Sequence, residues 1–184
     1  MTSPSTLTRA HGHDQPSEWV ARWGHMIAPR GAVLDLACGS GRHSRFLAAL
    51  GFKVCAVDRD PRALDALSGE AGVTVLHADL ENGPWPLDGL QFDGIVVTNY
   101  LHRPLFPHLL DALAPAGVLI YETFAAGNER FGKPSNPDFL LRHGELTDVV
   151  RGRLRVIAYE DLEVAPPRQA CIQRICACAL SAPV

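Results

Sequence analysis

The stretch VLDLACGSGRHSRFL, residues 33–47, joins an apolar strand-like run to a glycine loop and the start of a helix. The apolar run carries one acid, Asp35, and is followed by Gly39 and Gly41. Glycines at such a turn let the backbone approach a ligand closely and leave the first amides of the next helix free to face it. The stretch therefore predicts a strand, loop and helix unit with a ligand at the loop.

The same alternation extends outward along the chain. Strand-like runs are AVLDLA (32–37), KVCAVD (53–58), VTVLHAD (73–79), FDGIVVTN (92–99) and GVLIYETF (117–124). Helical spacing is found in SEWVARWGHMIA (17–28), GRHSRFLAAL (41–50), DPRALDALSG (60–69) and RPLFPHLLDALAP (103–115). We expect the first helix to place Trp19, Trp23 and Ile27 on one face and the second to point Phe46, Leu47 and Leu50 inward. Short apolar strands that alternate with helices predict a parallel sheet covered on both faces.

The end of the chain follows a different pattern. Two β-like runs, LRVIAYEDLEV (154–164) and ACIQRICACAL (170–180), are joined by only APPRQ (165–169), which is too short for a crossover helix. Strands joined so closely pair as a hairpin. The predicted fold is α/β, a Rossmann-like doubly wound, seven-stranded, mostly parallel sheet with an antiparallel C-terminal strand.

Length and composition indicate one ordinary globular domain. The 184 residues are 47% hydrophobic, which predicts a single domain over residues 1–184, with a flexible N-terminal segment (1–15) and a loop (125–137) that forms a substrate lid. Five cysteines without a C-x-x-C motif favour buried thiols in a reducing cytoplasm. No run reaches about 18 apolar residues, so we expect no membrane contact. We predict no metal site, although His11, His13 and Asp14 form an H-x-H-D motif.

Polar residues gather where the predicted strands end. Asp58 ends the second strand and Asp79 the third, and Asn99 with Tyr100 follows the fourth. Ligands of an open parallel sheet bind outside the carboxyl ends of its strands. A carboxylate at Asp58 can accept hydrogen bonds from two ribose hydroxyls, and Leu80 beside Asp79 offers an amide to an adenine edge. These positions predict an adenosine-bearing cofactor.

Asp35 lies inside the first strand rather than at its end. A carboxylate in that position needs hydrogen-bond partners. We expect amides of the glycine loop to be its donors, so that Asp35 supports the loop and touches the cofactor at most indirectly.

Five motifs in order carry a resemblance to a known family. VLDLACGSG, VCAVDRD, HADL, FDGIVVTNYL and PAGVLIYETF, between residues 33 and 124, resemble the successive motifs of class I S-adenosylmethionine-dependent methyltransferases, loosely of the small bacterial tellurite-resistance type. The resemblance implies S-adenosyl-L-methionine as the cofactor. The residues expected to bind it are Asp35, Ala37, Gly39, Gly41, Arg42, Asp58, Arg59, Asp79, Leu80, Asn99 and Tyr100.

The resemblance also implies how these residues share the cofactor. Gly39 and Gly41 would pack against its methionine part, Asp58 would hold the ribose, and Asn99 with Tyr100 would face the transferable methyl. Arg42 and His43 open the helix after the loop, where solvated first-turn side chains are the alternative.

The candidate catalytic residues are His102, Tyr100 and Glu122. His102 is the first choice for a general base, with a histidine that only contacts a helix start as its alternative. Tyr100 offers a ring face or a hydroxyl to a sulfonium. Glu122 could orient an acceptor, or pair with Arg103 or Arg130. Tyr121 and His43 lie nearby as further candidates.

The expected activity is methyl transfer to a small molecule, a metalloid or a thiol acceptor. The fourth-strand motif reads TNYL, whereas enzymes that methylate exocyclic base amines typically carry an Asn/Asp-Pro-Pro-aromatic run. A net charge of −3 also disfavours a polyanion-binding face. An RNA or tRNA methyltransferase stays open as an alternative, as does a non-catalytic module that only binds the cofactor.

A nicotinamide dehydrogenase fits less well. Its fingerprint requires a third glycine where the chain has Ser44, and no residues remain for a substrate domain. The sequence leaves the oligomeric state undetermined.

Overall fold

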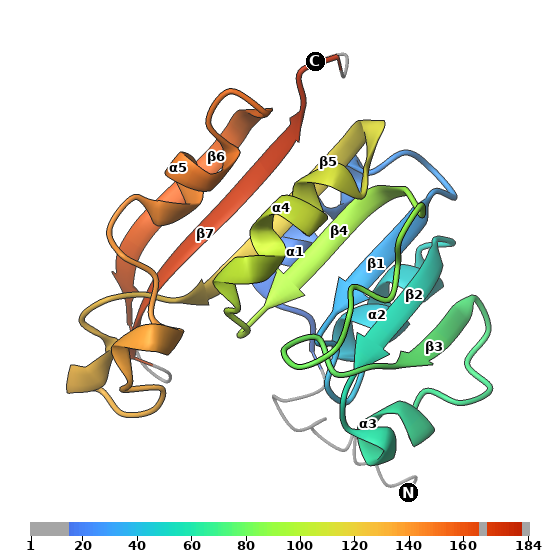
Figure 1. Ribbon diagram of the computed structural model, residues 1–184, viewed down its shortest axis with the longest axis horizontal. Helices are drawn as coiled ribbons and strands as arrows, with labels where there is room; N and C mark the ends of the chain where they lie inside the picture. Colours follow the sequence, from blue (N-terminus) through green and yellow to red (C-terminus); the bar gives the residue numbers. More distant parts are fainter. Residues whose placement is uncertain (1–14, 166–168, 182–184) are drawn as a thin grey trace, which may run out of the picture.

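The computed structural model describes residues 15–165 and 169–181 (Figure 1). The strands are β1 Ala32–Leu36, β2 Lys53–Asp58, β3 Val73–His77, β4 Phe92–Thr98, β5 Leu113–Phe124, β6 Leu154–Val164 and β7 Ala170–Ala179. The helices are α1 Glu18–Trp23, α2 Arg42–Ala49, α3 Pro61–Asp65, α4 Phe106–Asp111 and α5 Glu145–Val150. Single 3-10 turns are η1 Gly24–Met26, η2 Arg103–Leu105, η3 Asn128–Arg130 and η4 Pro137–Phe139.

All seven strands form one sheet in the order β3-β2-β1-β4-β5-β7-β6. The contacts from β3 through β5 are parallel, whereas β7 is antiparallel to both of its neighbours, β5 and β6. The predicted mostly parallel sheet with a reversed C-terminal strand is thereby confirmed. The chain moves outward from β1 to β3 and then returns to β4, so the strand order reverses between β1 and β4.

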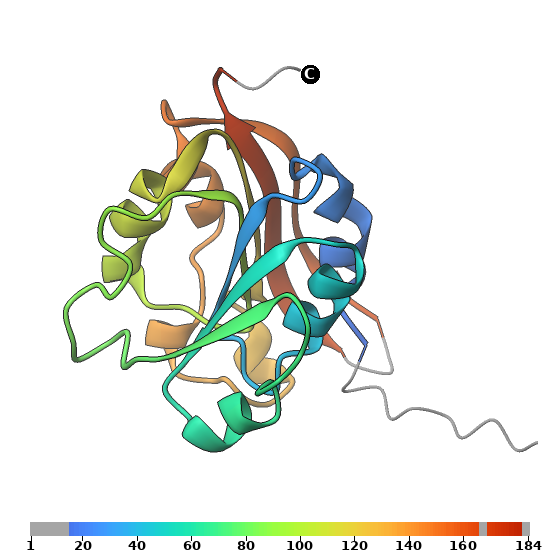
Figure 2. The ribbon, with the colours of Figure 1, turned by 90° about the vertical axis from the view of Figure 1, so that its right-hand side faces the viewer.

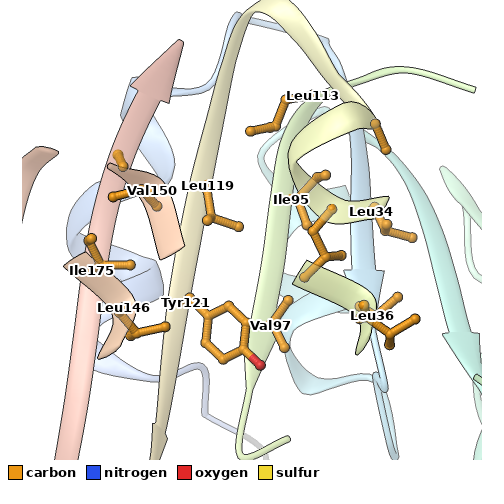
Figure 3. Packing of buried hydrophobic residues seen from close by; sticks show 14 of the residues in the cluster. Leu34, Leu36, Ile95, Val97, Leu113, Leu119, Tyr121, Leu146, Val150 and Ile175 are labelled. Atoms are coloured by element: carbon orange, nitrogen blue, oxygen red, sulfur yellow. The ribbon is translucent and has the colours of Figure 1, made fainter. Parts of the chain in front are cut away.

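Helices cover both faces of the sheet. Figure 2 shows α1 and α2 on one face and α4 with α5 on the other. Side chains alternate between the two faces along each strand. In β1, Leu34 and Leu36 join the core under α4 and α5, whereas Val33 joins the core under α1 and α2. Figure 3 shows the first of these cores, with Tyr121 of β5 among its aliphatic residues.

Several helix starts follow the capping rules. The side chain of Ser17 accepts a hydrogen bond from the amide of Val20 at the start of α1, and Asp60 accepts one from Arg62 at the start of α3. Both bonds satisfy amides that have no partner inside the helix. Trp19 and Ile27 of the predicted face are buried and Trp23 is half-buried, although α1 ends at Trp23 and Ile27 follows the turn η1.

Two details of the predicted elements are wrong. The helix before β5 ends at Asp111 rather than near Pro115, because β5 begins at Leu113, which pairs with Phe92 before the register shifts. Leu50, expected to point into the core, is 56% exposed, because α2 ends at Ala49 and Leu50 only caps it.

None of the helices within residues 15–165 and 169–181 has the length and apolar character needed to span a bilayer. His11, His13 and Asp14 lie outside the described residues, as does most of the predicted flexible segment.

Candidate functional site

A cleft of about 270 Å³ lies at the carboxyl ends of four neighbouring strands. The loops after β1, β2, β3 and β4 supply its walls, and in Figure 1 these strands end at the lower edge of the sheet. Its lining residues are Ala37, Asp58, Arg59, Ala78, Asp79, Leu80, Glu81, Asn99 and Tyr100. The cleft therefore straddles the point between β1 and β4 at which open α/β sheets bind ligands.

Seven of the predicted site residues meet in this cleft, namely Ala37, Asp58, Arg59, Asp79, Leu80, Asn99 and Tyr100. The others, Asp35, Gly39, Gly41, Arg42, His102 and Glu122, are not among its lining residues. Ala78 and Glu81 line the cleft but were not predicted. Both lie in the same loop as Asp79 and Leu80, so a wider reading of that loop could have found them.

Asp58 joins the glycine loop to the end of β2. Its Oδ2 accepts a hydrogen bond from the Gly39 amide at 2.7 Å, and its Oδ1 accepts one from the Asp60 amide at 2.9 Å. An ionised carboxylate has about four acceptor sites on its two oxygens. Asp58 is therefore held rigidly and keeps capacity for further donors from the cleft.

Two residues at the strand order reversal have a left-handed backbone. Ala37 follows β1 with φ of 52°, and Asn99 follows β4 with φ of 54°. Alanine rarely adopts this conformation, and strained residues of this kind persist where the surrounding structure fixes them. The amide of Asn99 donates to the Glu122 carbonyl at 2.9 Å, which fixes the end of β4 against β5.

The two glycines of the loop have different surroundings. A Cβ added at Gly39 would meet no atom within 4 Å, so this backbone borders open space. A Cβ at Gly41 would lie 2.3 Å from a methyl group of Leu67. Both have positive φ values. At position 41, the contact with Leu67, which follows α3, leaves no room for a side chain, so packing explains this glycine. At position 39, the open space leaves room for a ligand to approach the backbone closely.

Asp79 organises the loop after β3. Its Oδ2 accepts a hydrogen bond from the Asn82 side chain at 2.9 Å, and its Oδ1 accepts bonds from the amides of Glu81 and Asn82. These donors, with the Asn82 side chain first, lower the pKa of the exposed Asp79 carboxyl. Asp79 is therefore anionic at neutral pH, and it holds the loop that carries Leu80.

Tyr100 forms a wall of the cleft. Burial raises the pKa of its hydroxyl, and the nearby Glu81 carboxylate raises it further. Glu81 also lies 4.0 Å from the guanidinium of Arg59, so the loops after β2 and β3 meet at the mouth of the cleft. His102, two residues beyond Tyr100, is half-buried and caps η2 through its backbone position. Tyr100 is neutral, and His102 lies beside the cleft rather than in its wall.

Asp35 has a partner that differs from the expected one. It is 1% exposed, and its Oδ2 accepts a hydrogen bond from the Ser44 hydroxyl at 2.6 Å. The expected donors were loop amides, but Asp35 points to the face that α2 covers, where Ser44 lies in the first turn. Burial raises the pKa of Asp35 to about 6, although Ser44 counteracts it.

The first two residues of α2 are not both solvated. His43 is 2% exposed and contacts Ser17 and Thr98, so the solvated alternative is wrong for it. Arg42 is half-buried, and its Nη1 donates to the Gln15 carbonyl at 3.4 Å. Both side chains contact residues 15–17, which lie across the start of α2, so neither is surrounded by solvent only.

Glu122 faces away from the cleft, into an ion pair. Its carboxylate lies 3.3 Å from the guanidinium of Arg174, its cross-strand neighbour in β7. The predicted structural partners, Arg103 and Arg130, instead pair with Glu145 and Glu163. Strand parity explains this: Glu122 shares the face of Ile120, under α1, whereas Tyr121 points to the opposite face.

The predicted lid, residues 125–137, packs against the start of β7. The side chain of Asn128 is buried, donates to the Pro134 carbonyl at 2.9 Å and accepts from the Cys171 amide at 3.3 Å. Glu129 accepts a bond from the Gly127 amide. Arg130 of the same loop pairs with Glu163 and donates to the Gly127 carbonyl, so all three side chains are engaged within the fold, and a lid function stays a prediction.

Residues 33–117 match a family model described as "Methyltransferase domain". A curated relative, a protein-L-isoaspartate O-methyltransferase of Chlorobaculum tepidum, is 37% identical over 112 residues, which cover 55% of this chain and 49% of the relative. The chain thus spans about half the length of this relative.

Solved structures with the same fold are numerous. TehB of Haemophilus influenzae superposes with a TM-score of 0.71 at 20% identity, covering 94% of this chain and 63% of that one. An S-adenosylmethionine-dependent methyltransferase of Mesorhizobium loti gives 0.68 at 18% identity, covering 91% and 100%. At this identity, the likeness establishes the fold.

Proposed function

We propose that this chain, which carries a class I S-adenosylmethionine-dependent methyltransferase domain, transfers the methyl group of that cofactor to a small acceptor such as a metabolite, a metalloid or a thiol. The observation that carries the proposal is the cleft itself. Four successive strand ends bring Asp58, Asp79 and Leu80 together with Asn99 and Tyr100, at the reversal of strand order.

The residues present fit S-adenosylmethionine. Asp58 keeps acceptor capacity toward the cleft, as two ribose hydroxyls require. Leu80 is nearly buried in the lining and supplies an apolar side chain beside a purine, and Gly39 leaves open space for close backbone contact. The lining carries more negative than positive side chains, namely Asp58, Asp79 and Glu81 against Arg59. This excess of negative charge favours a ligand with a positively charged sulfur.

The chain's own residues have limited chemical tasks. The cofactor supplies a methyl group on a positively charged sulfur, which is already activated for displacement. Tyr100 and Asn99 would position the acceptor and exclude water, so orientation provides much of the rate. For a protonated acceptor, His102 would take the proton, since it lies half-buried beside the cleft.

The electrostatics of the cleft favour a small acceptor over RNA. Three acids and one arginine among the lining residues repel a phosphate backbone rather than attract it. The curated relative's name specifies an isoaspartyl acceptor, but the match covers only half of that protein. A small acceptor is therefore our proposal, with RNA as the alternative that the test must separate.

Calorimetry and isotope transfer test the proposal together. The protein is titrated with S-adenosylmethionine, S-adenosylhomocysteine and NAD, and we expect the first two to bind and NAD not to. It is then incubated with methyl-labelled cofactor and cell extract, and label is expected in the small-molecule fraction. Label in RNA alone would favour the alternative acceptor, and cofactor binding without any transfer would indicate a binding module. Tighter binding of NAD would refute the assignment.

A further inference from the structure

His43 is a buried histidine that joins three separate elements. It is the second residue of α2 and follows the glycine loop directly. The Ser17 amide donates to its Nε2 at 3.0 Å, and its Nδ1 lies 3.3 Å from the hydroxyl of Thr98 in β4. Its side chain therefore lies between the chain before α1 and the end of β4.

The two contacts fix which nitrogen of the ring carries the proton. A backbone amide can only donate, so Nε2 must be the unprotonated acceptor. The proton of the neutral ring is then on Nδ1, from which it is donated to the Thr98 hydroxyl. Burial also lowers the pKa of His43 to about 3, so the ring is neutral at physiological pH.

On one side, His43 holds the chain that leads into α1. Ser17 caps this helix, since its hydroxyl accepts from the Val20 amide at 3.1 Å. The neighbouring Arg42 donates to the Gln15 carbonyl. Two consecutive residues of α2 thus fasten residues 15–17 across the first turn of α2, next to Gly41.

On the other side, His43 holds the tip of β4. Thr98 immediately precedes Asn99, whose left-handed backbone lines the cleft. From the opposite face of the sheet, the Tyr121 hydroxyl donates to the Tyr100 carbonyl at 2.8 Å. Figure 3 shows this hydroxyl pointing along the sheet toward the end of β4, beyond Val97. The tip is therefore held from both faces.

We propose that His43 is a positioning residue, which sets the orientation of Asn99 and Tyr100 and couples the cleft to residues 15–17. It acts through two hydrogen bonds: its Nδ1–H donates to the Thr98 hydroxyl, and its Nε2 accepts from the Ser17 amide. This deepens the proposed function, because the ligand it assumes is the same cofactor. Removal of the Thr98 hydroxyl would release the tip on one face, while Tyr121 still holds the other. The cleft would then bind the cofactor more weakly without losing its lining.

Paired substitutions at Thr98 test the coupling. Thr98→Val removes the hydroxyl with little change of shape, and Thr98→Ser retains it. In calorimetry with S-adenosylhomocysteine, we expect about 5- to 10-fold weaker binding for the first, and binding within about twofold of the unsubstituted protein for the second. Val118→Ala, in β5 and in the core under α1 and α2, removes no hydrogen-bond partner of His43 and serves as a control that lowers the melting temperature at unchanged affinity. Equal affinity of Thr98→Val and the unsubstituted protein would reduce His43 to a structural role.

Nuclear magnetic resonance tests the geometry without any ligand. Long-range proton–nitrogen spectra of the imidazole should show the proton on Nδ1, and Thr98→Val should shift the amide signals of Ser17 and Asn99 together. A proton on Nε2, or shifts confined to residues adjoining Thr98, would overturn the proposal. If S-adenosylhomocysteine binds to none of the proteins, the proposed function fails, and these spectra still decide the role of His43.

Discussion

The two halves of the sheet use charged side chains differently. On the side of β5, β7 and β6, two carboxylates pair with arginines: the buried Glu145 with Arg103 at 2.7 Å, and the half-buried Glu122 with Arg174 at 3.3 Å. On the side of β3, β2, β1 and β4, amides hold the strand-end acids Asp58 and Asp79, and a hydroxyl holds Asp35 inside β1. Within the described residues, no ion pair includes Asp35, Asp58 or Asp79.

The difference separates acids that serve the fold from acids that can serve a ligand. A carboxylate that faces a guanidinium has its charge neutralised and its oxygens occupied. A carboxylate that accepts one or two amide bonds is oriented but keeps its charge and part of its acceptor capacity. Strand-end position alone does not distinguish Glu122 from Asp58, whereas the partner does.

Asp35 gives the largest expected effect, a dependence of stability on pH. Its folded-state pKa of about 6 exceeds the unfolded value of 3.8, so the folded state holds the proton more tightly between these values. Stability is therefore unaffected below about pH 4, falls as the pH rises from about 4 to about 6, and is level above that, with a total loss of about 3 kcal/mol for a shift of this size. Asp35→Asn cannot lose this proton. The free energy of unfolding of the variant, relative to that of the unsubstituted protein, should therefore rise between pH 4 and 7.

Denaturant titrations at several pH values measure this difference. His43 titrates with the opposite sign, since its lowered pKa makes the fold less stable toward acid, but it is present in both proteins and cancels. If the free energy of unfolding of the two proteins depends on pH in the same way, ionisation of Asp35 does not destabilise the fold. Asp35 would then be no evidence for a difference between the two halves of the sheet.

Asp58 should give the next largest effect, on binding. In Asp58→Ala the two ribose hydroxyls lose a charged acceptor, and we expect S-adenosylmethionine affinity to fall by about 2 kcal/mol, or roughly 30-fold. Asp60→Ala is the matched control, since Asp60 caps α3 and does not line the cleft. Calorimetry that finds equal affinities for both variants would mean that the ribose lies elsewhere.

Glu122 should give the smallest effect, and one on stability alone. Glu122→Gln leaves Arg174 paired with Glu160 at one side, so we expect a loss of about 1 kcal/mol in the free energy of unfolding. Cofactor affinity and methyl transfer should stay within twofold. Glu160→Gln should behave alike, and a drop in transfer by Glu122→Gln alone would restore Glu122 as a catalytic candidate.

The sequence predicted the parts of the fold that depend on local pattern. Apolar runs gave the strands, the linker of residues 165–169 gave the reversed β7, and Asp60 gave a helix start. In the cleft, Asp58, Asp79 and Asn99 were found because parallel strands bring their ends together. These inferences need only the order of the elements.

The missed features depend on which face a side chain takes and what packs there. Glu122 points under α1 because β5 begins at Leu113 and pairs with β7 in a register that sequence does not reveal. Ser44 reaches Asp35, and His43 reaches Thr98, only because α2 docks on that face of the sheet. Long-range packing of this kind leaves no local signal.

The position of β7 has a consequence for synthesis. β7 is the last strand along the chain, yet it lies inside the sheet, between β5 and β6. A growing polypeptide that has emerged only through β6 therefore holds two strands, β5 and β6, with no neighbour between them. Strands β1 to β4, which carry the cleft, all precede β6 and β7 in the chain, so they leave the ribosome before the strand that fills this gap.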